Sequence, residues 1–213
     1  MPTTISTIRA RVRQDLHDED SASYRWTDAE LDRHIGRAVG ELSLTAPLEA
    51  KTTLTTTAGS RELSLATVAD IVAVEAVEYP TGKYPPSYAR FSLWAGALTL
   101  LVDSPPAGAE SVSLLYTKLH MLNTTTSTLP SALEDLAATG AAAYAALEWA
   151  SFATNRVNAG GDETWRHYLT WGEERLAAFH QGLAQQARQR ALRSRRFYTP
   201  AQPKPSQSTD WGP

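Results

Sequence analysis

The sequence predicts an α+β fold that is mainly α: a four-helix bundle-like body, an inserted small antiparallel β-module and an extended C-terminal tail. Apolar residues recur every three or four positions near both ends of the chain, which is the helical period. Between these regions, short runs rich in β-branched residues are separated by Gly and Pro, as in strands and turns. The predicted division is an N-terminal helical pair, the inserted module, long helices completing the body, and a Pro-rich tail, at residues 1–47, 48–122, 123–196 and 197–213.

The N-terminal helical pair is predicted by an apolar stripe and by a helix-start signal. The stripe of the first helix consists of Ile5, Ile8, Val12 and Leu16. The second helix begins where Thr27 and Glu30 have the spacing of a capping box, with Trp26 and Leu31 in the two positions of a hydrophobic staple. We expect it to run to about Leu44, because a proline follows soon after.

The middle of the chain is predicted to form five or six short strands, enough for a small sheet or sandwich. The two runs on either side of the Ala58-Gly59-Ser60 turn are expected to pair as a hairpin. Proline and glycine turns separate the later runs. The predicted strand regions are 51–57, 61–65, 68–79, 88–94, 98–102 and 111–119.

Two long helices are predicted after the β-module. The third helix opens near Ser131 and carries small residues that allow close approach of its neighbours: Ala137, Ala138, Ala141, Ala142, Ala145 and Ala146. After a connection through Gly160 and Gly161, Asp162 is expected to cap a fourth helix that runs to about Ser194. Beyond Leu183 this helix is polar nearly all round, so it is expected to project from the body or to pack on a partner.

Composition and motifs argue against an enzyme. The chain has no cysteine, which excludes a disulfide scaffold, a Cys-ligated zinc site and a cysteine nucleophile. P-loop, dinucleotide-binding, serine-hydrolase and zinc-protease motifs are absent, and the five histidines do not pair at helical ligand spacing. The acidic residues Asp15, Asp18, Glu19 and Asp20 lack the glycine of a calcium loop and are interpreted as a solvated loop. We therefore predict no catalytic residue, no cofactor and no metal.

Charge and hydropathy bear on secretion, membrane association and nucleic-acid binding. The N-terminus lacks the apolar core of a secretory signal, and no stretch is long and apolar enough for a membrane span. We expect no membrane association and synthesis in the cytoplasm of the producing cell. The formal net charge of −3 and the pI of about 6.0 argue against a dedicated nucleic-acid-binding domain.

One basic cluster stands out against this mild acidity. It lies at the end of the fourth predicted helix and consists of Arg188, Arg190, Arg193, Arg195 and Arg196. It suits phosphate contacts, a partner surface lined by carboxylates, or a soluble helix end near the negative pole of the helix dipole. Phe197, Tyr198 and Trp211 follow it in the tail, where a simple spacer needs no aromatic residue. All eight residues are therefore candidates for partner binding.

The order of these parts resembles a known family. An amphipathic helix, an acidic loop and then a helix start containing Trp26, Thr27, Asp28, Glu30 and Leu31 resemble the opening of head-to-tail connector proteins (adaptor or head completion proteins) of tailed bacteriophages. The Ala-rich third helix, the long last helix and the Thr-rich run at residues 55–65 are also similar to parts of that family. The β-region is absent from its smallest members.

The resemblance implies a structural virion protein at the head-tail junction. It implies a homo-oligomeric ring, typically dodecameric, that docks on the portal protein, extends the DNA channel and meets the next neck or tail component. Duplex DNA would pass through the ring without sequence-specific binding, which suits an acidic body. C-terminal segments in this family often reach the portal or a neighbouring subunit, so the tail aromatics would be anchors that order on assembly.

Two other hypotheses about function are compatible with the sequence. A ring-forming DNA-packaging or DNA-binding protein, similar to a small terminase, would use the arginine cluster as its working surface and would bind DNA in a strongly salt-dependent way. A hydrolase would need a site assembled across the β-module and the helices, with titratable groups gathered in a pocket.

Overall fold

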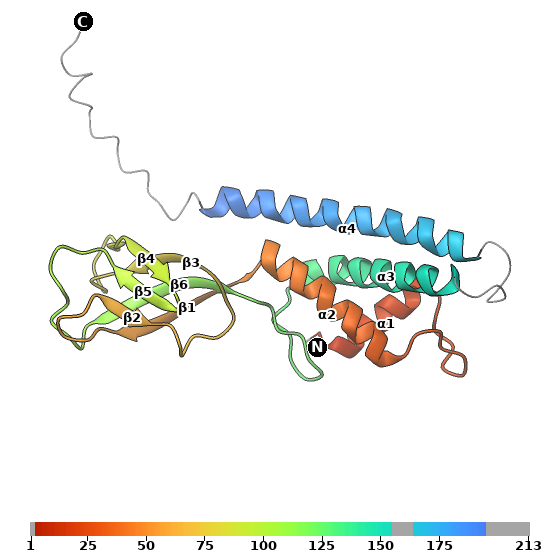
Figure 1. Cartoon of the computed structure of the whole chain (residues 1–213), viewed down its shortest axis with the longest axis horizontal. Helices are drawn as coiled ribbons and strands as arrows, with labels where there is room; N and C mark the ends of the chain where they lie inside the picture. Colours follow the sequence, from red (N-terminus) through yellow and green to blue (C-terminus); the bar gives the residue numbers. More distant parts are fainter. Residues whose placement is uncertain (1–2, 155–163, 195–213) are drawn as a thin grey trace, which may run out of the picture.

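The computed structural model describes residues 3–154 and 164–194, which form two lobes along one long axis. Figure 1 shows the helical body at one end, the β-module at the other, and the longest helix alongside both. The expected connection at residues 158–161, the Asp162 cap and the tail 197–213 lie outside the described residues. The predicted α+β class, with a four-helix body and an inserted β-module, is confirmed.

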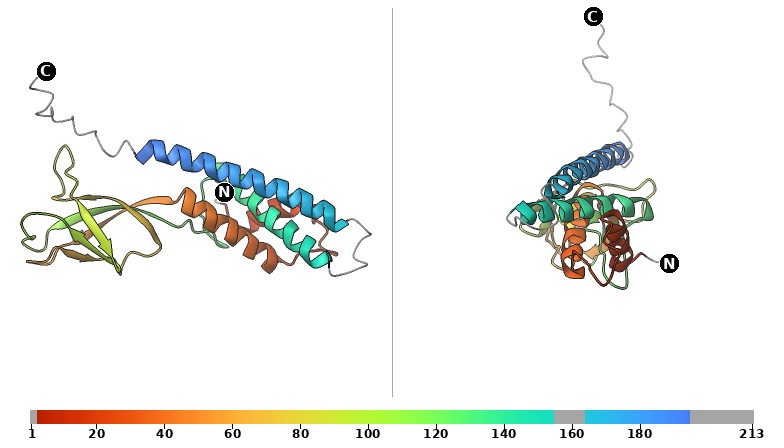
Figure 2. Two further views of the ribbon diagram at one scale, coloured as in Figure 1. Left: turned by 45° about the horizontal axis from the view of Figure 1, so that its top comes forward. Right: turned by 90° about the vertical axis from the view of Figure 1, so that its right-hand side faces the viewer.

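The four helices have the order and nearly the bounds that the sequence predicts. They are α1 (Ile5–Asp15), α2 (Asp28–Thr45), α3 (Ser131–Thr154) and α4 (Thr164–Ser194). Both views in Figure 2 place α3 between α4 on one side and the α1–α2 pair on the other. The third helix is therefore the centre of the body.

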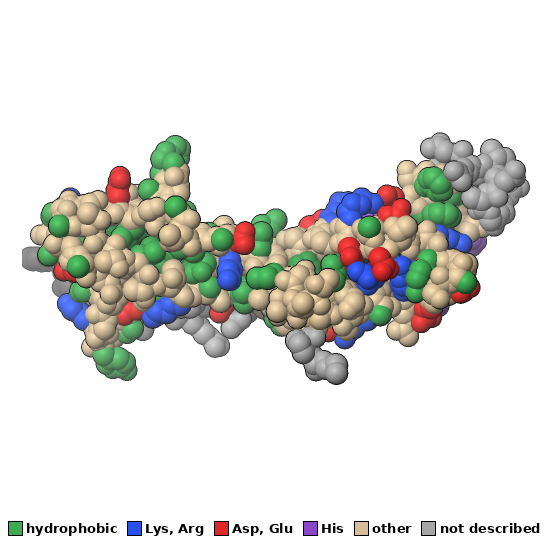
Figure 3. Space-filling model, turned by 90° about the horizontal axis from the view of Figure 1, so that it is seen from below, with side chains coloured by type: hydrophobic (Ala, Val, Ile, Leu, Met, Phe, Trp, Pro, Cys, Tyr) green, Lys and Arg blue, Asp and Glu red, His purple; other side chains and the backbone are tan. Residues whose placement is uncertain are grey.

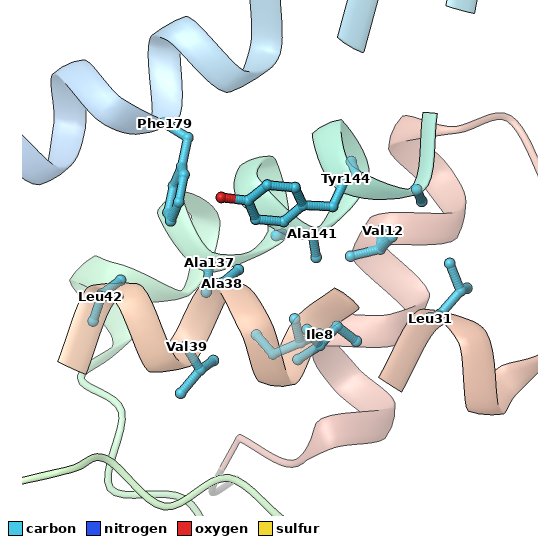
Figure 4. Close-up of a cluster of buried hydrophobic side chains, with 14 of the residues drawn as sticks. Ile8, Val12, Leu31, Ala38, Val39, Leu42, Ala137, Ala141, Tyr144 and Phe179 are labelled. Atoms are coloured by element: carbon cyan, nitrogen blue, oxygen red, sulfur yellow. The ribbon is translucent and has the colours of Figure 1, made fainter. Parts of the chain in front are cut away.

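The body core depends on the small residues of α3. Nine of its alanines are buried, so the neighbouring helices approach its backbone closely: Ala137, Ala138, Ala141, Ala142, Ala143, Ala145, Ala146, Ala150 and Ala153. Figure 4 shows Phe179 of α4 and Tyr144 of α3 lying over this surface, with ring centroids 6.3 Å apart in an edge-to-face arrangement. A Cβ at Gly140 would lie 2.9 Å from the Phe179 ring, so this position requires glycine for the approach of α4.

Two three-stranded antiparallel sheets share one core in the β-module. One sheet has the order β1 (Leu48–Thr55), β6 (Ser111–Lys118), β3 (Ile71–Glu78), and the other β2 (Glu62–Ser64), β5 (Ala97–Leu100), β4 (Phe91–Trp94). Alternate side chains of the strands point inward, as the period of two requires. The buried members of the core are Leu63, Leu65, Val77, Leu98, Leu100, Val112, Leu114 and Tyr116.

The predicted hairpin across residues 51–65 is wrong. β1 pairs over its full length with β6, from Leu48 opposite Lys118 to Thr55 opposite Ser111. β2 pairs instead with β5 in the other sheet. The turn between β1 and β2 therefore carries the chain from one sheet to the next. The Thr-rich run and the short alternating run were correctly predicted as strands, but their partners are distant in sequence.

The two lobes are joined by a narrow connection (the waist, at Ser43, Ala46 and His120) and, among the described residues, by an ion pair between α4 and β3. At the waist, the backbone N–H of His120 donates to Ser43 Oγ at 3.0 Å, and its ring Nε2 lies 2.9 Å from the carbonyl oxygen of Ala46. Arg190 of α4 forms an ion pair with Glu75 of β3. The polar end of α4 was expected to project or to meet a partner, but within the described residues it also contacts its own β-module.

Candidate functional site

The start of α2 is the part of the predicted signature that the structure tests most directly. The backbone N–H of Glu30 donates to Thr27 Oγ1 at 3.3 Å, and the backbone N–H of Thr27 donates to Glu30 Oε2 at 2.7 Å. These two bonds form the predicted capping box. The hydrogen bonds from Thr27 lower the pKa of Glu30. Trp26 and Leu31 are both buried in the body core, which agrees with the staple.

Asp28, the next residue of the signature, holds α1 against α2. Its carboxylate accepts from Arg13 at 2.7 Å and from Arg9 at 2.8 Å. The hydrogen bond from Arg13 is the main cause that lowers the pKa of Asp28, and the charge of Arg9 adds to it. Arg9 also forms an ion pair with Asp32 one turn further along α2. The aspartate of the signature therefore locks the N-terminal helical pair.

The acidic loop before α2 is more structured than the sequence predicts. Asp18 is buried and accepts from Arg13 at 2.5 Å and from the backbone N–H of Arg25 at 2.7 Å. The interpretation as a solvated loop is therefore wrong for Asp18, because a buried arginine and loop amides replace its water. Asp20 is exposed, and its pKa is lowered by hydrogen bonds from Ser23 and from the backbone of Ala22. Arg13, about one turn before the loop, is the buried partner of Asp18 that the sequence analysis did not identify.

Trp26 belongs to an aromatic cluster that joins this loop to α3 and α4. Its ring lies 6.0 Å from Trp149 and 6.0 Å from Tyr168, edge-to-face in both cases. The Arg25 guanidinium lies 4.8 Å from the Trp149 ring and contacts the Tyr168 hydroxyl. The cluster fixes the start of α4 on the body.

A cleft of about 420 Å³ opens beside this cluster. Three of its polar groups serve the fold, because Asp18 binds Arg13, Asp20 binds Ser23, and Arg25 binds Tyr168. Within the described residues, no group of three or more metal-ligating side chains gathers. The lining residues are Asp15, Leu16, His17, Asp18, Asp20, Ser23, Arg25, Trp26, His167, Tyr168 and Trp171.

Two titratable centres lie where α2 meets α3 and α4. The Tyr144 hydroxyl donates to the Glu41 carboxylate at 2.8 Å, and burial with this bond raises the pKa of Tyr144 to about 12. His34 is buried, with its Nε2 2.7 Å from Glu148. Burial lowers the pKa of His34, and this effect exceeds the opposite effect of the nearby Glu148 carboxylate, which raises it. Both centres connect helices, and neither opens into the cleft.

The described part of the arginine cluster divides between the chain itself and the solvent. Arg190 binds Glu75 of β3, whereas Arg188 is exposed. Arg193 lies in the last turn of α4. The candidates outside the described residues are Arg195, Arg196, Phe197, Tyr198 and Trp211.

The β-module carries a surface that sequence analysis missed. Five large hydrophobic side chains are exposed within residues 84–101: Tyr84, Tyr88, Leu93, Trp94 and Leu101. Figure 3 shows hydrophobic side chains projecting from two opposite sides of the module. Exposed aromatic residues of this size are typical of protein-protein contacts. Four of them lie in the predicted strand regions 88–94 and 98–102, where strand propensity does not separate exposed from buried residues, and Tyr84 lies in the connection before them.

None of the helices in residues 3–154 and 164–194 combines the length and hydropathy needed to cross a bilayer. The described elements thus offer three candidate contact regions: the cleft beside Trp26, the arginine-bearing end of α4, and the exposed aromatic residues of the β-module.

Comparison with known proteins gives the following matches. A family model described as SU10 adaptor protein matches residues 3–204. No curated protein matches the sequence significantly. A chain in the neck of a native GTA particle, computed with C12 symmetry, is 14% identical over 82% of this chain and 93% of that chain, with a TM-score of 0.29. A chain in the neck of an empty GTA particle, computed with C6 symmetry, is 16% identical over 81% and 88%, with a TM-score of 0.28.

The family match spans both lobes. It includes the capped start of α2, the β-module, the whole of α4 and ten residues beyond its end at Ser194. The resemblance to head-to-tail adaptors of tailed bacteriophages, first seen in residues 24–35, is thereby confirmed. The chain belongs to the SU10 adaptor protein family.

Proposed function

We propose that this chain is a structural head-to-tail adaptor that forms a dodecameric ring on the portal of a tailed bacteriophage. In this role it extends the DNA channel from the portal to the next neck or tail component and is part of the virion. The observation that carries the proposal is the adaptor-family match over residues 3–204, which covers the body, the β-module and α4 together.

The architecture supports a subunit that connects two neighbouring components. α4 is 31 residues long, so it spans about 46 Å at 1.5 Å per residue and runs alongside both lobes. Its first half packs on α3, and Arg190 near its end binds β3. Because α4 contacts both lobes, it fixes the position of one lobe relative to the other. A component that connects two neighbours needs such a fixed arrangement.

The charge distribution supports a channel that DNA passes without being held. The chain has 20 Lys and Arg residues against 23 Asp and Glu residues. Tight non-specific DNA binding requires an excess of cations that displace condensed counterions. Arg190, a member of the arginine cluster, is engaged with Glu75. The alternative, a DNA-packaging ring that uses this cluster, is therefore the weaker proposal.

The test is binding to assembled portal rings from the same phage genome, measured by sedimentation and electron microscopy. Three versions are compared: the full chain, a version ending at Arg196, which removes only the tail, and a version ending at Ala187. Because the shortest version also loses the Glu75 contact, full-length Arg190→Gln is the matched control. Binding by the full chain alone would place the portal anchors in the tail. Binding by all versions would place the interface on the body.

Two outcomes would overturn the proposal. Failure of the full chain to bind portal rings would remove the adaptor function. Tight binding of duplex DNA at physiological salt, lost when the arginines of the cluster are changed to alanine, would favour the DNA-packaging alternative. The five substitutions are Arg188→Ala, Arg190→Ala, Arg193→Ala, Arg195→Ala and Arg196→Ala.

A further inference from the structure

The β4–β5 hairpin presents a tryptophan that the fold of a single chain does not use. Trp94 is 84% exposed at the end of β4, next to a tight turn in which Ala95 and Gly96 both have positive φ. It lies opposite Ala97, and this pair belongs to the row of side chains that alternates away from the core residue Leu98. β4 is also an edge strand of its sheet. An exposed indole beside an open edge is a typical anchor for another protein surface.

The loop between β3 and β4 presents a second apolar surface. Tyr84 is 99% exposed, and Pro85 and Pro86 after it are exposed as well. The loop is held at its base, where the Tyr79 N–H donates to the Ser87 carbonyl at 2.9 Å. Prolines have no N–H to lose hydration, so an aromatic ring can cover them at little polar cost.

These two surfaces point in opposite directions. Figure 2 shows the loop between β3 and β4 and the β4–β5 hairpin directed away from one another, on the two sides of the module across its long axis. Figure 3 shows hydrophobic projections on two opposite sides of the same module. One module therefore cannot bring its own indole to its own proline pair, and two modules cannot exchange both contacts with each other at the same time.

We propose that Trp94 of one copy packs on the Tyr84-Pro85-Pro86 surface of the next copy, so that the β-modules form a head-to-tail contact around the ring. The inference rests on the proposed ring function and names a surface that joins its subunits. A contact between two unlike surfaces on opposite sides is heterologous, and such a contact closes into a ring when the rotation permits. A second copy is the occupant that uses both surfaces in one interaction, because every copy contributes an indole on one side and a Tyr-Pro-Pro surface on the other.

The absence of cysteine in the sequence makes the contact directly testable. Full-length Ser92→Cys, Lys83→Cys and the double variant keep Trp94 and the Tyr84-Pro85-Pro86 surface, and both substituted positions are exposed. They are assembled on portal rings and treated with a short thiol-thiol crosslinker. The double variant is expected to give a ladder of covalent oligomers. Each single variant is expected to give no covalent oligomer, and a mixture of the two to give covalent dimers only. The matched control is Leu44→Cys with Lys83→Cys, since Leu44 is 63% exposed but lies on α2.

Electron microscopy of the same samples separates the possible failures. Rings on the portal without a ladder would overturn the contact and leave the adaptor function intact. No ring with the unsubstituted chain would remove both proposals. A covalent product between Ser92→Cys and the portal would overturn the contact by assigning the surface around Trp94 to a different partner. Trp94→Ala is expected to raise the chain concentration needed for ring assembly more than tenfold, in the range typical of interface tryptophans.

Discussion

The helical body buries most of its large hydrophobic side chains, whereas the β-module carries the two most exposed ones among the described residues. Ile8, Leu31 and Phe179 in the body are wholly buried, but Tyr84 and Trp94 in the module are 99% and 84% exposed. The alanines of α3 allow close packing of four helices, while two three-stranded sheets have too little area to cover every aromatic side chain. Packing within one chain therefore leaves Tyr84 and Trp94 in solvent, and these are the residues of the proposed contact between copies.

The two lobes also differ in their charges. Arg9 and Arg13 in the body form a connected network with Asp18, Asp28 and Asp32. In the module, the described cross-strand ion pair is Lys51 with Glu78 at 3.4 Å, and Glu75 binds α4. The ion pairs of the body therefore hold α1 against α2. In the module, Glu75 contributes an ion pair that connects β3 to α4.

The largest expected effect comes from emptying the body core. Phe179→Ala is expected to lower the free energy of unfolding by about 3–5 kcal/mol, since the ring is wholly buried against Tyr144 and Gly140. Urea unfolding followed by circular dichroism at the helical band measures the change. Leu44→Ala, at a 63% exposed position of α2, is the control and should change stability by less than about 0.5 kcal/mol. A loss below 1 kcal/mol for Phe179→Ala would contradict the described packing of α4.

Overfilling the same contact is expected to have the next largest effect. Gly140→Val places methyl groups into the Phe179 ring, since a Cβ there already lies 2.9 Å from it, and should cost about 1–3 kcal/mol. The matched control is Gly182→Ala, whose Cβ would meet a terminal methyl of the flexible, half-buried Leu136. Thermal unfolding of both variants gives the comparison. Equal losses would show that the two approaches of α4 to α3 are equally rigid.

Tyr144 tests how tightly the α2–α3 contact is closed. Its pKa is raised to about 12, so its folding contribution is complete below pH 10 and is lost as the pH rises through about 12. Ultraviolet titration of phenolate absorbance should show a tyrosine that titrates near pH 12 and is missing in Tyr144→Phe. The pKa of Tyr79 is also raised, by its hydrogen bond to Glu110, and its titration should remain in that variant. At neutral pH that variant should lose about 1 kcal/mol, because Glu41 loses its hydroxyl donor. Titration of every tyrosine near pH 10 would contradict the contact.

The smallest expected effect concerns the link between the two lobes. A double-mutant cycle with Glu75→Gln and Arg190→Gln should give a coupling energy of about 0.5 kcal/mol, since both side chains are about 30% exposed. The coupling should fall in high salt. Small-angle scattering of the variants measures whether the β-module then samples more orientations relative to the body. An unchanged scattering profile together with zero coupling would show that the waist alone sets the arrangement.

The helical elements were predictable because their signals are local. The spacing of Thr27 and Glu30 predicts the capping box, and both of its hydrogen bonds are present. The apolar stripe of α1 predicts the burial of Ile8 and Val12. The fourth helix is present over Thr164–Ser194, as its apolar stripe predicts. Each of these features depends on contacts within one or two helical turns.

The pairing of the strands could not be read in the same way. The runs at residues 51–57 and 61–65 have the composition and turn of a hairpin, yet β1 pairs with β6 and β2 with β5. Pairing depends on which strands share a buried face, and that depends on the whole module. The burial of Asp18 and Arg13 was also missed, because neither the helical period nor the acidic composition of the loop indicates that these two side chains form an ion pair in the interior.

The sequence by itself determined the positions of the helices, the strand character of the middle region and the family to which the chain belongs. Only the tertiary structure decided which strands pair, that Arg190 reaches Glu75, and that Trp94 and Tyr84 remain in solvent. Helix starts and apolar periods act over a few residues. Strand partners, ion pairs between lobes and the exposure of an aromatic ring depend on segments tens of residues apart meeting in one place.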